Sequence, residues 1–153
     1  MKVKVINGPN LNMLGIRNPS VYGHMTYKDL VRELQEYAIN RHIEVEFFQS
    51  NSEGAIIDAI HDSHFNEFNA LIINPGAFTH YSYAIRDALE SVPNILKVEV
   101  HISDIYQRES FRQVNVMKDV VNHSIVGKGI KGYFEALDYI HSKIHRQNEA
   151  SSL

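Results

Sequence analysis

The chain has 153 residues, of which 44% are hydrophobic and 22% are charged, with a formal net charge of -3 and no cysteine. This length fits one domain with a single core, and the charge gives no electrostatic reason to expect nucleic acid or an anionic membrane as a partner. The lack of cysteine excludes disulfides, thiolate catalysis and zinc–thiolate sites, and it suits a reducing cytoplasm, where we expect the protein to work. Because Lys2 and Lys4 interrupt the first apolar run, we expect no secretory signal.

Five segments rich in β-branched residues predict the strands of a sheet. In chain order they are Lys2–Asn7, Glu44–Gln49, Ala70–Asn74, Ile95–His101 and His123–Val126. The third, ALIIN, begins with an unbroken apolar run, which is typical of a central parallel strand that is covered on both faces.

Helical patterns lie between these strands and after the last one. They cover Thr26–His42, Glu53–Phe65, Ser82–Ser91 and Ile130–His145, and the first of them opens with Thr26 and Asp29 in capping-box spacing. Repeated strand–helix units imply a parallel sheet with helices on both faces. We therefore predict an α/β fold, a flavodoxin-like three-layer sandwich with a five-stranded parallel sheet. Residues 1–146 are expected to form a single catalytic domain, and residues 147–153 a frayed C-terminal tail.

Polar or Gly/Pro-rich segments directly follow four of the strands. They are Asn7–Asn10, Ser50–Glu53, Asn74–Ala77 and His101–Asp104. In an open parallel sheet the carboxyl ends of the strands meet at one edge, and ligands bind there. The convergence predicts a binding site at this edge, although Gly, Asn and Pro are also the residues that ordinary turns require.

The connection Gly8–Met25 is much longer than the roughly 2–6 residues that usually join a strand to the next helix. It carries Arg17 and Tyr22 between two possible hinges, Gly15 and Gly23. Such a loop suggests a lid that brings a cation and a phenol to a substrate. The alternative is a surface Ω-loop that Tyr22 anchors by packing.

Several short motifs occur in an order and at a spacing that together identify a protein family, although no single motif would identify it alone. They are INGPNLNMLG (Ile6–Gly15), RNPSVYG (Arg17–Gly23), QSNSE (Gln49–Glu53), NPGAFTH (Asn74–His80), EVHIS (Glu99–Ser103), RESFR (Arg108–Arg112) and GIKGY (Gly129–Tyr133). With these motifs the chain resembles the type II dehydroquinases over about Lys2 to Ile140.

The resemblance implies trans-elimination of water from 3-dehydroquinate to give 3-dehydroshikimate through an enolate, without a metal or covalent cofactor. The same reaction serves the shikimate pathway and quinate breakdown. Tyr22 matches the family's base, which acts as a tyrosinate, and Arg17 matches the arginine that favours this ionised form. His101 matches the general acid, and Glu99, on the same strand face, orients it. Asn10 matches the residue that holds a water against the enolate oxygen.

The resemblance also implies a set of substrate-binding residues. Asn74 and the backbone amides of Ile102 and Ser103 match the groups that receive the substrate carboxylate. His80 and Arg112 match residues that contact ring hydroxyls or neighbouring groups of the site.

Asp87 matches a further residue of this set, and it is expected to reach a site across a subunit boundary. The family assembles trimers into dodecamers, so we expect a homododecamer. The chain departs from the family pattern at Asp104, where asparagine is usual, and at Ser110, which replaces the second glutamate of an REE run. Asp104 is expected to bring negative charge near the carboxylate pocket.

Rival functions from other classes have weaker support. Gly127, Gly129 and Gly132 satisfy G-x-G-x-x-G, but a dinucleotide site needs a second strand and an acidic residue about 20 positions later, which the sequence does not supply. A flavodoxin-like FMN or phosphate module is disfavoured because the first loop is not rich in Ser or Thr. A catalytically dead scaffold is disfavoured because the matched base, arginine and acid are intact.

Nine histidines also invite a metal hypothesis. The pairs His61/His64 and His141/His145 have helical spacing, but neither pair has a convincing third ligand at the active edge. Solvated helix faces explain them better, and we expect no metal site.

Overall fold

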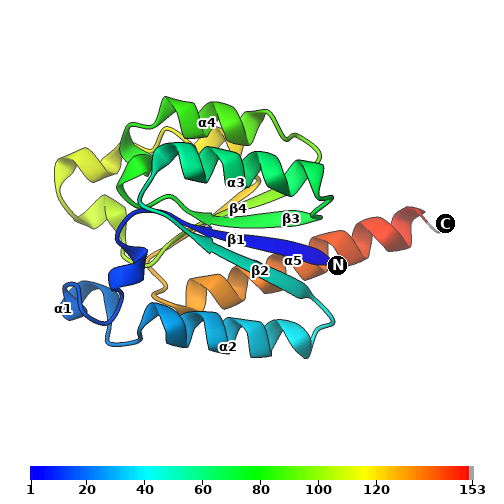
Figure 1. Ribbon diagram of the computed structural model, residues 1–153, viewed down its shortest axis with the longest axis horizontal. Coiled ribbons are helices and arrows are strands. Elements are labelled where there is room, and N and C mark those ends of the chain that lie inside the picture. The colour runs from blue at the N-terminus through cyan, green and yellow to red at the C-terminus, as the bar shows by residue number, and fades with distance from the viewer. Residues whose placement is uncertain (152–153) are drawn as a thin grey trace.

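A computed structural model describes residues 1–151 and contains one sheet of five parallel strands. The strands are β1 (Lys2–Asn7), β2 (Glu44–Gln49), β3 (Ala70–Asn74), β4 (Leu96–His101) and β5 (His123–Val126), in the order β2-β1-β3-β4-β5 (Figure 1). β3 lies in the centre of the sheet with every residue buried, as its apolar run predicts. The predicted five-stranded parallel α/β fold is confirmed.

Helices cover both faces of the sheet. α2 (Tyr27–Ile39) and α5 (Lys131–Ser151) pack on one face, and α3 (Glu53–Phe65) and α4 (Tyr83–Glu90) pack on the other, which gives three layers (Figure 1). The short helix α1 (Pro19–Tyr22) lies in the long connection after β1.

Each face of the sheet has its own apolar core, because alternate residues of a strand point to opposite faces. In β3, Ala70 and Ile72 belong to the core under α2 and α5, whereas Leu71 and Ile73 belong to the core under α3 and α4. A slip of one residue would exchange these two sets, so the double burial fixes the register in which the strand ends meet.

Residues with hydroxyl side chains cap the N-termini of α2, α3 and α4, the helices that follow β1, β2 and β3. Thr26 forms the predicted capping box of α2 with Asp29. Ser52 accepts a hydrogen bond from the N–H of Ala55 at 3.3 Å, and Ser82 accepts one from Ile85 at 3.1 Å. These caps fix where each helix begins, and therefore which residues are left to form the connections at the carboxyl edge.

The last helix is longer than the sequence predicted. α5 continues to Ser151, so residues 147–151, which were expected to fray, are helical, while residues 152–153 lie outside the described part. Its first turns bury Tyr133, Leu137 and Ile140 against the sheet, whereas its last turns are exposed. The exposed turns include Glu149 and Ala150, which favour helix without burial. No helix within residues 1–151 is both long and apolar enough to cross a membrane.

Candidate active site

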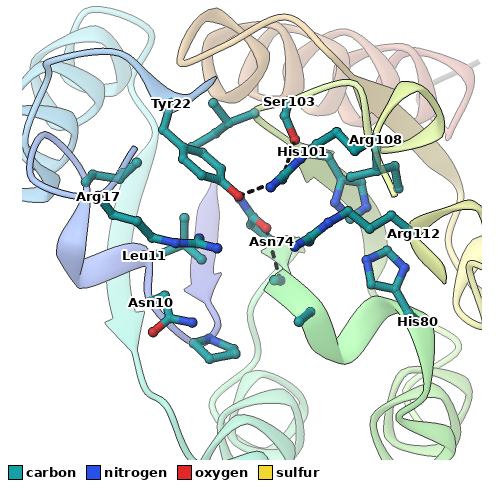
Figure 2. A pocket seen from close by; sticks show the side chains of 16 residues that line it. Asn10, Leu11, Arg17, Tyr22, Asn74, His80, His101, Ser103, Arg108 and Arg112 are labelled. Carbon is teal, nitrogen blue, oxygen red and sulfur yellow. Dashed lines mark hydrogen bonds between the residues drawn. The ribbon is translucent and has the colours of Figure 1, made fainter. Parts of the chain in front are cut away.

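A pocket opens at the carboxyl edge of the sheet, where β1, β3 and β4 end (Figure 2). Its walls include Asn10, Asn74 and His101, one from the connection or strand end at each of these three strands. Among the described residues, the segment after β2 does not line the pocket. Its Asn51 instead accepts a hydrogen bond from the backbone N–H of Asn10 at 3.0 Å. Three of the four segments expected to converge therefore meet at the pocket, and the fourth supports one of them.

Two glycines let the connections after β1 and β3 approach each other. A Cβ on Gly8 would lie 2.6 Å from the carbonyl oxygen of Pro75. Gly76 has a φ of 58°, and a Cβ there would lie 3.0 Å from the carbonyl oxygen of Pro9. Both positions require glycine, and this close approach holds the two connections side by side at the pocket.

Tyr22 ends α1 and directs its phenol into the pocket toward two arginines (Figure 2). Arg108 donates a hydrogen bond from Nη1 to the phenol oxygen at 2.7 Å and another to Ser103 Oγ at 3.3 Å. Arg17 lies over the ring, with its guanidinium carbon 4.7 Å from the ring centroid. Arg17 and Tyr22 are thus neighbours, but the cation at the oxygen is Arg108.

Sequence reasoning missed Arg108 as a site residue. It lies in the RESFR motif, of which only Arg112 was given a role, and it follows the 3-10 helix η3 (Ile105–Gln107). Arg108 and Tyr22 are 86 residues apart, so no local spacing links them. The only signal available was a second arginine in a motif that belongs to the site.

His101 and Glu99 lie on one face of β4, and both are buried. His101 Nε2 is 3.0 Å from Glu99 Oε2, which is within ion-pair distance when the imidazole is protonated. Asn115 Nδ2 donates to both carboxylate oxygens, at 3.0 and 2.9 Å, and Ser124 Oγ donates to Oε1 at 2.8 Å. Burial raises the pKa of Glu99, but His101, Ser124 and Asn115 together outweigh burial and hold that pKa below its ordinary value. Glu99 is therefore a fixed anion beside the imidazole at neutral pH.

Asn115 and Ser124 were not predicted either. Asn115 lies in the irregular connection between β4 and β5, and Ser124 lies on the edge strand β5. Asn115 Oδ1 also accepts the N–H of Met117 at 2.9 Å, which orients the amide so that its nitrogen faces Glu99. Polar residues in a connection carry no sequence signal of a buried partner, so only the fold shows this role.

Asn74, Ile102 and Ser103, the residues expected to receive a carboxylate, all line the pocket. The amide of Asn74 is held on both sides. Its Oδ1 accepts the backbone N–H of Gly76 at 3.1 Å, and its Nδ2 donates to the hydroxyl of Tyr133 at 3.0 Å.

His80 and Arg112 also line the pocket (Figure 2). His80 Nδ1 lies 2.7 Å from the carbonyl oxygen of Val114, and because a carbonyl only accepts, this nitrogen carries the proton. Burial lowers the pKa of His80, and the hydrogen bond to Val114 offsets this only in part. Arg112 donates from Nε to Glu109 at 2.9 Å, which holds its side chain at the pocket.

Two of the expected site residues do not line the pocket. Glu99 lies behind His101, and Asp87 is exposed on α4. Asp104, which was expected to bring negative charge to the carboxylate pocket, is also absent from the lining. Its Oδ1 accepts the N–H of Tyr106 at 3.1 Å and caps η3, so this departure from the family pattern has a local structural role.

The competing sequence patterns have structural explanations. Gly132 packs against the sheet, where a Cβ would lie 3.2 Å from the side chain of Val100. The ring of His64 contacts Phe65, and His141 stacks on His145. Within residues 1–151, no group of three His, Asp or Glu side chains is arranged to hold a metal ion.

The charges around the pocket favour an anionic ligand. Arg17, Arg108 and Arg112 all line it, and the described lining residues include no carboxylate. A phenol and an imidazole reach the same space, one beside arginines and one beside the buried anion of Glu99. The arrangement suits a reaction of an anion that needs both a base and an acid.

The chain matches the family model for class II dehydroquinase over residues 1–141. It is 51% identical over 140 residues to 3-dehydroquinate dehydratase of Lachnospira eligens, which covers 92% of this chain and 95% of that protein. The crystal structure of type II dehydroquinase from Butyrivibrio crossotus is similar with a TM-score of 0.91 and 56% identity, covering 92% of this chain and 97% of that one. The type II dehydroquinase of Propionibacterium acnes gives a TM-score of 0.89 and 40% identity, covering 92% and 96%. The resemblance read from the motifs is confirmed, and the chain belongs to the class II dehydroquinase family.

Proposed function

We propose that this pocket catalyses the trans-elimination of water from 3-dehydroquinate, with Tyr22 as the base and His101 as the acid. Dehydration of 3-dehydroquinate is the reaction of this chain by its family membership. One observation carries the residue roles. The phenol of Tyr22, held by Arg108 at 2.7 Å, lies in the same pocket as His101, whose partner is the buried anion of Glu99.

In the first step Tyr22, as tyrosinate, removes a proton from C2 beside the ketone, and the electron pair moves onto the ketone oxygen to form an enolate. A cation about 4 Å from an anion stabilises it by up to about 4 kcal/mol at an effective dielectric of about 20. That is the scale a phenol of ordinary acidity needs in order to act as a base near pH 7. We assign the larger share to Arg108, at the oxygen, and a smaller one to Arg17, at the ring face.

In the second step the enolate returns its electron pair, the bond from C1 to its hydroxyl oxygen breaks, and His101 donates a proton so that the oxygen leaves as water. The imidazole must carry the proton that it gives up in this step, and the Glu99 carboxylate lies 3.0 Å from its Nε2. Asn115 and Ser124 keep Glu99 ionised in its buried position. Solvent exchange then removes the proton from Tyr22 and restores the one on His101.

The remaining groups bind and orient the substrate. Asn74 and the backbone amides of Ile102 and Ser103 receive the carboxylate. His80 and Arg112 contact the ring hydroxyls, as a neutral imidazole and a charged guanidinium respectively.

Asn10 holds a water against the enolate oxygen. Its backbone is in the left-handed conformation, with a φ of 70°, and its N–H is anchored by Asn51. This backbone turn sets the position of the side chain at the pocket.

Residues 1–146 form the catalytic domain, which works in the cytoplasm as a homododecamer built from trimers. The absence of cysteine suits a reducing compartment.

Asp87 is exposed on α4 near Tyr81 and Tyr83, which are 58% and 67% exposed, so this surface suits burial against another copy. Asp87 then completes the site of the neighbouring subunit. Light scattering should give a mass of twelve chains, and a fully active monomer would contradict this assembly.

The test is turnover of 3-dehydroquinate by the purified chain, followed as the enone absorbance of the product. Tyr22→Phe serves as the matched inactive variant. A correctly folded wild-type chain without turnover would support a catalytically dead scaffold, and a yellow preparation with bound flavin would support an FMN module.

A further inference from the structure

We infer that Tyr133 and Asn7 are positioning residues that make Asn74 present an N–H donor to the substrate carboxylate. Neither residue lines the pocket among the described residues, and neither has a place in the chemistry above. The three side chains come from α5, β1 and β3, and hydrogen bonds join them in a row. The inference rests on the proposed function, which gives the carboxylate to Asn74.

One unambiguous donor fixes the direction of the whole row. The backbone N–H of Gly76 can only donate, so the Asn74 atom that it contacts at 3.1 Å is Oδ1. The Nδ2 of Asn74 therefore faces the hydroxyl of Tyr133 at 3.0 Å, and that hydroxyl accepts. The proton of the hydroxyl then goes to Asn7 Oδ1 at 2.6 Å. A flipped Asn74 would set two donors against each other at Gly76.

This orientation leaves one N–H of the Asn74 amide available to a ligand in the pocket. The amide of Asn74 has two N–H groups, and Tyr133 uses one of them. The second remains for a ligand in the pocket that Asn74 lines. A carboxylate accepts hydrogen bonds and cannot donate, so this orientation binds it. An amide turned the other way would present its oxygen and repel it.

The row is sealed from water, so solvent cannot replace a missing partner. Tyr133 and Asn7 are 0% exposed. Burial raises the pKa of Tyr133 well above its ordinary value, so its hydroxyl stays protonated and keeps donating to Asn7.

Asn7 accepts the proton of Tyr133 through its Oδ1. Its buried Nδ2 makes no hydrogen bond of standard geometry among the described residues, and the Tyr27 hydroxyl is the other polar group beside this side chain. A leucine has a similar shape but would remove the acceptor and leave the Tyr133 hydroxyl unpaired. The direction that Asn7 imposes on the Tyr133 hydroxyl is therefore the role that we assign to this amide.

The first test is Tyr133→Phe, which removes only the hydroxyl. We expect KM for 3-dehydroquinate to rise about tenfold or more, the scale of one hydrogen bond to a charged group. We expect kcat to stay within about twofold, because the carboxylate keeps its charge while the neighbouring bonds react, so it is bound about equally in the ground and transition states. Tyr37→Phe is the matched control. Its hydroxyl donates to Asp138 at 2.7 Å between α2 and α5, and its loss should leave KM unchanged.

A second readout separates positioning from a general loss of structure. Inhibition constants are measured for a cyclohexane carboxylate analogue of the substrate and for its primary carboxamide. The wild type should prefer the carboxylate, and Tyr133→Phe should lose most of that preference. Asn7→Leu, which leaves the Tyr133 hydroxyl without its acceptor, should shift KM and the preference in the same direction, and it serves if Tyr133→Phe folds poorly.

A double variant shows whether Tyr133 acts through Asn74. Asn74→Ala should raise KM, and adding Tyr133→Phe to it should raise KM no further. Wild-type KM and preference in both Tyr133→Phe and Asn7→Leu, or additive effects in the double variant, would overturn the inference. If Asn74→Ala leaves KM unchanged, the inference fails while the dehydratase function stands. If the wild-type chain does not turn over 3-dehydroquinate, the proposed function itself fails.

Discussion

The acid and the base of this pocket stand on two walls that are built differently. On the β4 wall, Glu99 is 0% exposed and His101 is 3% exposed, and the carboxylate is held by Asn115 and Ser124. The other wall, which we call the loop wall, is formed by Tyr22 and Arg108. Tyr22 ends a short helix that has no buried residue, and its phenol oxygen is held by Arg108 from a different connection.

The contrast shows two ways of placing a charged group beside a reacting side chain. On the β4 wall the sheet positions a buried anion, so the electrostatic environment of the acid exists before substrate arrives. On the loop wall the environment of the base depends on two irregular connections staying together, and segments with few buried contacts open at low free energy. Changes on the loop wall should therefore alter activity far more than stability, whereas changes behind His101 should alter stability as well.

The largest effect is expected from Tyr22→Phe. Loss of a general base lowers kcat by about 10²–10⁴-fold. The free energy of unfolding should hardly change, because the side chain is only half-buried. The checks are steady-state kinetics and urea denaturation of the same preparation. Near-normal turnover would remove Tyr22 as the base, and a large loss of stability would show that the loop wall is as integral to the fold as β4.

A comparison of Arg108→Gln with Arg17→Gln sharpens the contrast within the loop wall. Arg108→Gln removes the cation at the phenol oxygen and should lower kcat/KM by up to about 10³-fold at pH 7. Arg17→Gln should lose about tenfold, because its charge lies over the ring. Steady-state kinetics at pH 7 give kcat/KM for both variants. A larger loss in Arg17→Gln than in Arg108→Gln would return the main role to Arg17.

On the β4 wall, Asn115→Ala should destabilise the protein by about 2 kcal/mol at pH 7, since it removes hydrogen bonds to a buried charge. The pKa of Glu99 is depressed in the folded protein, so its ionised form contributes stability above its ordinary pKa of 4.5, and this contribution is lost as pH falls through the folded pKa. The difference in the free energy of unfolding between wild type and Asn115→Ala should therefore become smaller below about pH 4.5.

Asn122→Ala is the matched control for this titration. Its Oδ1 accepts the N–H of Lys97 at 2.8 Å, a hydrogen bond to a neutral group. Urea denaturation at pH 7 and near pH 4 measures both variants, and the loss of stability in Asn122→Ala should be the same at the two pH values. A constant difference for Asn115→Ala would show that Asn115 does not stabilise the ionised form of Glu99.

The smallest effect is expected from removal of metal ions. Base and acid are assigned to side chains, and the enolate oxygen to a water held by Asn10, so dialysis against EDTA should leave kcat/KM unchanged. The described lining residues include no lysine, so borohydride should trap no substrate on the chain. Loss of activity after EDTA treatment, or a covalent adduct with the substrate, would contradict the roles of Tyr22 as base and His101 as acid.

Much of the fold was predictable because its signals are local. The apolar run of β3 is buried in the centre of the sheet, and the Thr26–Asp29 spacing forms a capping box at α2. The length of α5 was not predictable from apolar spacing, since its last turns form without burying a face. Helix propensity alone is a weak signal, and the absence of an apolar stripe was read as fraying.

The sequence by itself determined the sheet, the edge at which its connections converge and, through short motifs, the pocket positions of Tyr22 and His101. These features follow from periodicity, turn chemistry and order along the chain, which neighbouring residues encode. Only the tertiary structure decided which groups meet across the pocket. Arg108 reaches a phenol 86 residues away. Ser124 reaches Glu99 from the next strand, and Tyr133 lies 126 residues from the Asn7 that accepts its proton. A hydrogen bond depends on distances of a few tenths of an ångström, and these are set by how helices and connections pack on the sheet rather than by any spacing along the chain.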